Sequence, residues 1–234
     1  KRKLNASKTS HFGTLDPKVT GVLPISINRA CRLSDYFIHR KKTYVGIIRI
    51  HEEITQEKLK QEMNKFIGKI KQLPPVKSRV KREEREREVK SFKILEIEGK
   101  DVLFEAEVEA GTYVRKLIHD LGEKIGGVHM VELRRIKAGI FNIKDSYTID
   151  NIEKAVSEWK EGNNENELRK ILIPAEIVQQ LITRVDIKED AVNSLLNGKP
   201  FMKNDIIGKI PNSDLYSVFC RDRFIGIYKG INGI

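Results

Sequence analysis

The sequence is poor in cysteine, in long apolar runs and in clustered metal ligands. It contains two cysteines in 234 residues, Cys31 and Cys220, too few and too far apart for a disulfide framework, which indicates a reducing compartment. No apolar run approaches the ~18 residues that a membrane-spanning helix needs. The five histidines form no His/Cys cluster and no His-Glu-x-x-His motif, so we expect no bound metal. With 39% hydrophobic residues, the chain is expected to be a soluble, globular protein.

Acidic residues are scarce in the N-terminal part of the chain. Residues 1–49 contain eleven Lys and Arg but only two acidic residues, Asp16 and Asp35, which accounts for +9 of the total net charge of +11. Such a region would attract a polyanion, and nucleic acid fits a soluble protein better than a membrane surface does. Judged by charge alone, the alternative is a basic surface that only keeps the protein soluble and binds no nucleic acid.

One carboxylate lies among turn-forming residues in the segment from Ser10 to Ile25. Gly13 can adopt positive φ, and Pro17 biases Asp16 toward an extended backbone, so the sequence largely dictates the shape of this loop. A stiff loop holds a side chain in place, which is what a catalytic carboxylate needs. An ordinary strand-entry turn with a solvated Asp is the alternative.

Hydrophobic periodicity predicts a chain of mixed helices and strands. The mixed charge run from Lys81 to Lys90 is expected to be a solvated helix or an exposed strand. Arg115 is expected near a helix start, where the macrodipole disfavours a cation, so another interaction should hold it there. The expected helices are 55–67, 112–125 and 151–159, and the expected strands are 41–50, 91–98, 101–109, 185–187, 206–210, 215–220 and 224–228, with a loop at 72–75.

The Asp16 segment resembles the signature of the TruB/dyskerin family of RNA pseudouridine synthases. Residues 14–17 and 20–23 match its Thr-Leu-Asp-Pro and Thr-Gly-Val-Leu, although Ser10 stands where the family usually has Gly. Three further segments resemble the same family in the same order, and four ordered motifs are far more specific than one. These segments are Lys42–Tyr44, Gly111–Gly122 and Gly127–Phe141.

The resemblance implies roles for particular side chains. Asp16 falls on the catalytic Asp, Arg115 on the Arg that pairs with it, Tyr44 on the Tyr that faces the target base, and Leu133 on the Leu that lines the pocket. Burial beside a flipped base can raise the pKa of an Asp by as much as about 3 to 5 units, whereas a nearby Arg lowers it by about 1 to 3, so Arg115 would keep Asp16 ionised. The expected substrate-pocket residues are His11, Gly13, Thr14, Leu15, Lys42 and Leu133. The expected RNA-binding residues are Lys8, Lys18, Lys77, Arg79, Lys81 and Arg82.

The resemblance also implies the fold. We expect an α+β protein in which a mixed, largely antiparallel sheet with flanking helices forms a catalytic domain over residues 1–183. A small β-rich module over 184–234 resembles the opening of a PUA domain and is shorter than usual. The family's upstream Lys-Pro-x-Gly segment is absent, so the first strand-and-helix unit of the family is expected to be missing.

The basic segment Leu73–Arg82 favours the archaeal and eukaryotic dyskerin type over bacterial TruB. This type implies the catalytic subunit of a guide-RNA-directed H/ACA ribonucleoprotein. Its partners would be an H/ACA guide RNA, target rRNA or tRNA, and Nop-ten-, Gar-one- and ribosomal L7-like proteins. Its location would be cytoplasmic in an archaeon and nucleolar in a eukaryote, and an isomerisation of this kind needs no cofactor. The alternatives are a stand-alone TruB-like tRNA enzyme and a non-catalytic RNA-binding scaffold.

Overall fold

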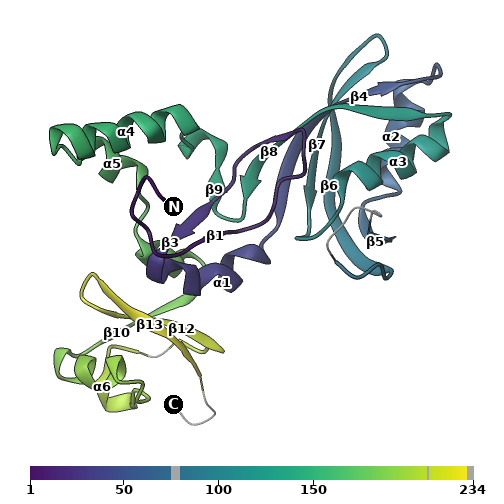
Figure 1. Cartoon of the computed structure of the whole chain (residues 1–234). Helices are drawn as coiled ribbons and strands as arrows, with labels where there is room; N and C mark the ends of the chain where they lie inside the picture. Colours follow the sequence, from purple (N-terminus) through teal and green to yellow (C-terminus); the bar gives the residue numbers. More distant parts are fainter. Residues whose placement is uncertain (75–79, 210, 231–234) are drawn as a thin grey trace. The chain divides into compact units, whose positions relative to one another are not determined.

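The computed structural model describes residues 1–234 except 75–79, 210 and 231–234. Two compact units divide the chain, Lys1–Tyr147 and Thr148–Ile234, and both contain helices and strands (Figure 1). The mixed α+β class predicted from the sequence is confirmed. The division falls earlier than the domain boundary expected at residues 183 and 184, and the extent of the C-terminal module stays a prediction.

A mixed sheet of seven strands forms the first unit, in the order β2-β8-β4-β7-β6-β5 with β9 paired to β8. Strands β2 and β8 run parallel, whereas the other pairs are antiparallel. The parallel pair matters because it docks the segment that follows Asp16 onto the sheet. The strands are β2 (Val19–Gly21), β4 (Lys42–Ile50), β5 (Gly68–Gln72), β6 (Arg85–Glu98), β7 (Asp101–Val108), β8 (Val128–Ala138) and β9 (Phe141–Asn142).

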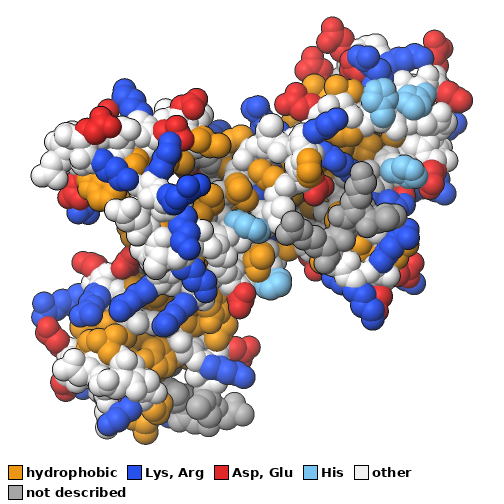
Figure 2. Space-filling view, viewed as in Figure 1, with side chains coloured by type: hydrophobic (Ala, Val, Ile, Leu, Met, Phe, Trp, Pro, Cys, Tyr) orange, Lys and Arg blue, Asp and Glu red, His pale blue; other side chains and the backbone are white. Residues whose placement is uncertain are grey.

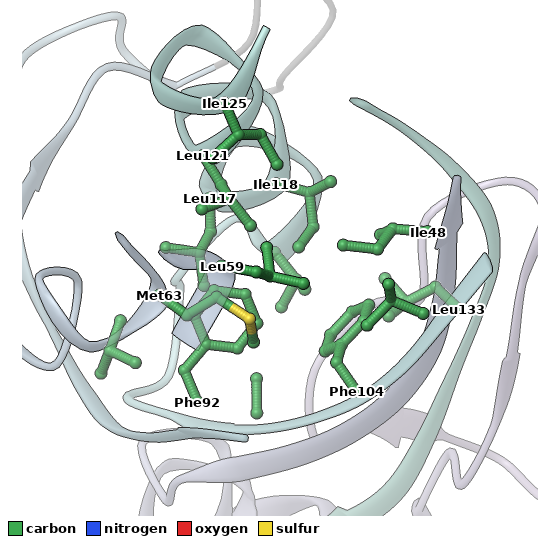
Figure 3. Close-up of a cluster of buried hydrophobic side chains, with 14 of the residues drawn as sticks. Ile48, Leu59, Met63, Phe92, Phe104, Leu117, Ile118, Leu121, Ile125 and Leu133 are labelled. Carbon is green, nitrogen blue, oxygen red and sulfur yellow. The ribbon is translucent and has the colours of Figure 1, made fainter. Parts of the chain in front are cut away.

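Two helices, α2 (Gln56–Asn64) and α3 (Val114–Ile125), contribute to the same core as the sheet (Figure 3). Thr55 caps α2 by accepting a hydrogen bond from the backbone N–H of Lys58, and Gly126 ends α3 in a left-handed conformation. The apolar stripe predicted for α3 is buried. Burial of each such side chain stabilises the fold by about 1.5 to 3 kcal/mol. The stripe consists of Val114, Leu117, Ile118, Leu121 and Ile125.

The segment around Asp16 is closed into a loop at its base. Strands β1 (Thr9–His11) and β3 (Ile25–Ile27) pair antiparallel, and the N–H of Phe12 donates to the carbonyl of Pro24 at 3.0 Å. Phe12 also stacks on Phe37 of α1 (Ser34–Ile38), with ring centroids 4.8 Å apart. Phe141 of β9 contacts both rings. We call residues 12–24 the Asp16 loop, and its base is fixed by strand pairing and by this aromatic cluster.

The second unit contains two longer helical segments and a separate four-stranded sheet. Helix α4 (Ile149–Gly162) begins with a capping box between Thr148 and Asn151, and α5 (Asn166–Ile171) follows it. The sheet has the order β11-β10-β12-β13 and shares a core with α6 (Val192–Leu196). Its strands are β10 (Thr183–Ile187), β11 (Ile206–Ile207), β12 (Leu215–Cys220) and β13 (Arg223–Lys229).

Short 3-10 helices connect these elements: η1 (Asn28–Leu33), η2 (Ile143–Asp145), η3 (Ala175–Gln180), η4 (Glu189–Ala191) and η5 (Lys203–Asp205). Among the described helices, none is both long and apolar enough to cross a bilayer.

Most of the expected elements form, but the sequence did not predict β8. This strand lies between β2 and β4, and its pairing with β4 is interrupted by two register shifts. Bulges break the alternation of polar and apolar residues that identifies a strand. The charge run from Lys81 enters β6 at Arg85, so its second half is a strand, one of the two expected forms. This part of the strand is less exposed than expected, because Arg85, Arg87 and Glu88 are half-buried and Val89 is fully buried.

Candidate active site

Asp16 lies in a tight turn at the tip of its loop. The N–H of Val19 donates to the carbonyl of Asp16 at 3.0 Å, with Pro17 and Lys18 between them. Lys18 has a φ of 68°, a left-handed conformation that costs a non-glycine residue about 1 to 3 kcal/mol. Such strain persists only where neighbouring contacts fix the backbone.

The chain after this turn lies directly against β8. The N–H of Val22 donates to the carbonyl of Arg135 at 2.9 Å, and Gly21 pairs with Arg135 in register. Gly21 has a φ of 105°, and a Cβ at this position would overlap the backbone of Arg135. Only glycine therefore allows the loop to approach the sheet this closely.

Arg115 is exposed in the first turn of α3, and its Nη2 donates to the carbonyl of Pro17. This contact supplies the interaction that the sequence required for a cation at a helix start. The ion pair expected between Arg115 and Asp16 is not formed in this structure. Among the described residues, no Arg or Lys nitrogen lies within 4.0 Å of the Asp16 carboxylate. Both side chains are exposed, and an exposed pair gains only about 0 to 1 kcal/mol. Pairing of Arg115 with Asp16 in the presence of RNA stays a prediction.

Tyr44 lies in β4, half-buried against the hydrophobic core. Burial raises the pKa of its phenol, the guanidinium of Arg135 opposes this rise, and the carboxylate of Asp16 adds to it. The phenol therefore lies within the electrostatic influence of both charged groups. The structure places Asp16 near enough to Tyr44 for the two groups to interact electrostatically, and their catalytic roles stay a prediction.

Arg135 is the residue that sequence reasoning missed. Its side chain is 1% exposed and donates three hydrogen bonds to the Asp16 loop. Nε binds the carbonyl of Val22 at 2.8 Å, Nη2 that of Gly13 at 2.9 Å, and Nη1 that of Thr14 at 3.3 Å. A signal was present in the sequence, since Arg135 follows the buried Leu133 by two residues and so faces the same side of a strand.

Lys42 is also buried, with 4% of its surface exposed. Its Nζ donates to the carbonyls of Ile38 and Arg40, each at 2.6 Å. Burial, and secondarily the charge of Arg135, lower the pKa of Lys42 to about 8. A Cβ at Gly13 would lie 3.4 Å from Cε of Lys42, so this side chain packs beneath the loop rather than facing solvent.

The remaining predicted residues occupy varied environments. His11 and Thr14 are exposed, Leu15 is half-buried, and Leu133 is buried in the core beneath the sheet. Lys8, Lys18, Lys81 and Arg82 are exposed, as RNA contacts require. Lys77 and Arg79 lie outside the described residues. Lys and Arg are interspersed with Asp and Glu around the seven-stranded sheet, so the basic side chains share this surface with acidic ones (Figure 2).

The described residues contain one group of three side chains with metal-ligand chemistry, His119, Asp120 and Glu123 on α3. Their ligand atoms lie within 4.8 Å of one another. Lys116 already forms an ion pair with Asp120, which competes with a cation for that carboxylate.

Comparisons with known proteins match most of the chain. Residues 1–114 match the family model described as TruB family pseudouridylate synthase (N terminal domain), and residues 115–179 match that of the tRNA pseudouridylate synthase B C-terminal domain. The chain is 42% identical to the probable tRNA pseudouridine synthase B of Methanothermobacter thermautotrophicus, covering 88% of the chain and 64% of that protein. It is 38% identical to the protein of the same name from Pyrococcus abyssi, over 99% of the chain and 71% of that protein.

Solved structures are similar over nearly the whole chain. A crystal structure of a Cbf5-Nop10-Gar1 complex matches with a TM-score of 0.86 and 37% identity, covering 98% of this chain and 72% of the other. An H/ACA RNP bound to a substrate RNA containing 2′-deoxyuridine matches with a TM-score of 0.86 and 35% identity, covering 98% and 71%. The chain spans about three-fifths of the length of several curated relatives, 64%, 57% and 61% for three of them.

Proposed function

Because the chain belongs to the TruB family of pseudouridylate synthases, we propose that it isomerises uridine to pseudouridine in RNA. In this reaction the bond between N1 of uracil and C1′ of ribose breaks, the base rotates, and C5 bonds to C1′. The proton on C5 is lost and N1 gains one, so the atoms balance without an external reactant.

Asp16 is the residue that initiates the reaction in this proposal. Its carboxylate either attacks C1′ or assists elimination at C2′, and both routes need an ionised oxygen held beside the sugar. Asp16 is exposed in the protein alone, so bound RNA has to complete the exclusion of water. A flipped nucleotide would do this by covering the loop.

Tyr44 and the neighbouring cations complete the site. The phenol of Tyr44 would stack on the flipped uracil and could relay the C5 proton. Arg115 already binds the carbonyl of Pro17, the residue after Asp16, so a change of side-chain rotamer would be enough to bring it toward the carboxylate. Its positive charge would then favour the ionised form of the carboxylate once bound RNA excludes water.

The observation that carries the proposal is the Asp16 loop itself. A family-matching carboxylate lies in a turn that is bound by Arg115, held from below by Arg135 and close to Tyr44. A solvated strand-entry turn would not need a buried guanidinium beneath it.

We further propose that a guide RNA selects the target, as in an H/ACA ribonucleoprotein. The similar solved structures, which are complexes of Cbf5 with Nop10 and Gar1 or with substrate RNA, support this assignment. Partners of the Nop10, Gar1 and L7-like type would then assemble with the chain, and the β-rich sheet of residues 183–229 would act as a PUA-like module that binds the guide. Several archaeal relatives carry the name tRNA pseudouridine synthase, which supports activity on unguided tRNA as the second candidate.

Tritium release from RNA labelled at C5 of uridine tests both levels of the proposal. The chain would be assayed on bare tRNA and on a target RNA with guide RNA and the partner proteins. Tritium release in either format supports pseudouridine synthase activity. Release that depends on the guide RNA supports a guide-directed ribonucleoprotein. RNA binding without release in both formats would instead support a non-catalytic scaffold.

A further inference from the structure

Arg135 carries a buried charge that has no acidic partner in the part of the chain that the structure describes. The guanidinium is 1% exposed, and no carboxylate of the described residues lies within 4.0 Å of its nitrogens. A buried cation is disfavoured unless it is paired or fully hydrogen-bonded. Here backbone carbonyls provide the compensation, and all three of those that Arg135 binds belong to the Asp16 loop.

The three carbonyls lie on both sides of Asp16 in the sequence. Gly13 and Thr14 precede Asp16, whereas Val22 follows it. The backbone carbonyl of Arg135 also accepts the N–H of Val22. Arg135 therefore binds the loop both where it leaves the aromatic cluster and where it joins the sheet.

The position of Arg135 also relates the loop to Tyr44. The two residues are cross-strand neighbours, because Tyr44 of β4 pairs with Arg135 of β8. A guanidinium has rigid planar geometry, so its hydrogen bonds define direction as well as distance. The strand pair that holds Tyr44 thus also holds the loop that carries Asp16.

We propose that Arg135 is the positioning residue of the active site, whose buried guanidinium sets the location of Asp16 relative to Tyr44. This inference rests on the proposed pseudouridine synthase activity. Arg135 acts through the loop backbone and does not need to touch the RNA. Its contribution is therefore to the rate of the chemical step and not to RNA affinity.

The test compares Arg135→Lys, Arg135→Gln and the matched control Arg134→Gln. Lys keeps the positive charge but loses the planar set of N–H donors that a guanidinium has. Gln keeps an amide donor but loses the charge. Arg134 is the adjacent exposed residue of the same strand, and its Nε donates to the hydroxyl of Thr20 in the same loop. Arg134→Gln therefore removes an exposed side-chain contact to the loop and leaves the buried backbone contacts of Arg135 in place. The wild type is assayed first, in whichever RNA format supports turnover.

Three measurements are made on each variant. The single-turnover rate at saturating RNA should fall about 10- to 100-fold in both Arg135 variants, since a displacement of about 1 Å can reduce a rate 100-fold, while the RNA dissociation constant stays within about threefold. Hydrogen exchange should accelerate in residues 12–22. The phenol of Tyr44, followed by fluorine NMR of fluorotyrosine-labelled protein and assigned with Tyr44→Phe, should titrate at higher pH in Arg135→Gln than in Arg135→Lys.

The possible results distinguish a failure of the positioning role of Arg135 from a failure of the proposed pseudouridine synthase activity. An inactive wild type would overturn the proposed function. An active wild type with Arg135 variants of equal rate, unchanged loop exchange and an unchanged Tyr44 titration would overturn the inference alone. If Arg135→Gln fails to fold, Arg135→Lys decides the question, and a loss of RNA affinity with an unchanged rate would also contradict the positioning role.

Discussion

Two charged regions of the first unit hold their charges in opposite ways. Beneath the Asp16 loop, Arg135 and Lys42 are buried and bind backbone carbonyls. In the hairpin of β5 and β6, Lys69 pairs with Glu86 at 2.8 Å and Lys71 with Glu84 at 3.3 Å, and all four side chains are exposed. The hairpin has the more obvious charge pattern in the sequence, yet exposed ion pairs contribute little to stability.

The environment of a charge, more than its presence, decides what the charge does. A buried cation that binds backbone fixes the position of a segment, because its hydrogen bonds cannot be exchanged for water. An exposed cation remains free to contact phosphate. Variants in the two regions test this contrast, and those that should change stability or rate most come first.

Gly21→Ala and Gly68→Ala compare the two regions at two glycines with nearly equal φ angles. Gly21 has a φ of 105° and Gly68 a φ of 102°, so alanine is strained at both positions by about 1 to 3 kcal/mol. A Cβ at Gly21 would also overlap the backbone of Arg135, whereas a Cβ at Gly68 would have no atom of another described residue within 4 Å, apart from its chain neighbours. We expect Gly21→Ala to lower the free energy of unfolding by about 1 to 3 kcal/mol more than Gly68→Ala does, measured by urea denaturation. Equal losses would show that the loop does not pack closely on β8.

The second prediction concerns pH and Lys42. Its pKa of about 8 in the folded protein lies below the ordinary value of 10.5, so the folded state disfavours the charged amine. The resulting destabilisation, at most about 3 kcal/mol, is fully present below pH 8 and is relieved as the pH rises from about 8 to 10.5. Stability of the wild type relative to Lys42→Met should therefore increase across this window. A flat difference would mean that Lys42 is not desolvated.

Arg115→Met probes the contact between α3 and the turn. Loss of the bond to the carbonyl of Pro17 should lower the single-turnover rate about 10- to 100-fold through displacement of Asp16, with a smaller effect on RNA affinity. Arg115→Lys should recover part of the rate, because Lys keeps a donor and the charge. A wild-type rate in Arg115→Met would show that Arg115 does not contribute to the reaction.

The smallest effect is expected in the hairpin. Exchange of Lys69 and Glu86, as Lys69→Glu with Glu86→Lys, keeps the exposed pair and should change the free energy of unfolding by less than about 0.5 kcal/mol. Each single replacement brings like charges together and should cost up to about 1 kcal/mol. A much larger loss on exchange would mean that the hairpin is held as specifically as the Asp16 loop.

The sequence was sufficient for elements with strong local patterns. The apolar stripe of α3, the Thr55 cap of α2, and β4 with Tyr44 all depend on neighbouring residues, and all form as expected. The Asp16 turn is likewise local, since Pro17 and Gly13 restrict it. These features need no knowledge of which segments meet.

Contacts between residues far apart in the chain could not be predicted from the sequence in the same way. Arg135 binds Gly13, 122 residues earlier, and reaches it because β8 pairs with β4 in a register shifted by two irregularities. One residue of register would turn the guanidinium to the other face of the sheet. Arg115 was expected at the Asp16 carboxylate and instead binds the adjacent carbonyl, a choice between acceptors that depends on the conformation of both exposed chains.

The most direct test separates chemistry from affinity by assaying two variants together. Asp16→Asn is nearly isosteric and removes the carboxylate, whereas the double variant Lys81→Gln with Arg82→Gln removes two exposed cations beside the hairpin. Pseudouridine would be quantified in digested RNA, and the RNA dissociation constant would be measured across a salt series.

We expect no pseudouridine and near-normal RNA binding for Asp16→Asn. For the double variant we expect a normal rate at saturating RNA, weaker binding, and a salt slope that is shallower by about 0.7 for each phosphate that the protein no longer binds. Substantial pseudouridine formation by Asp16→Asn would show that Asp16 does not initiate the reaction.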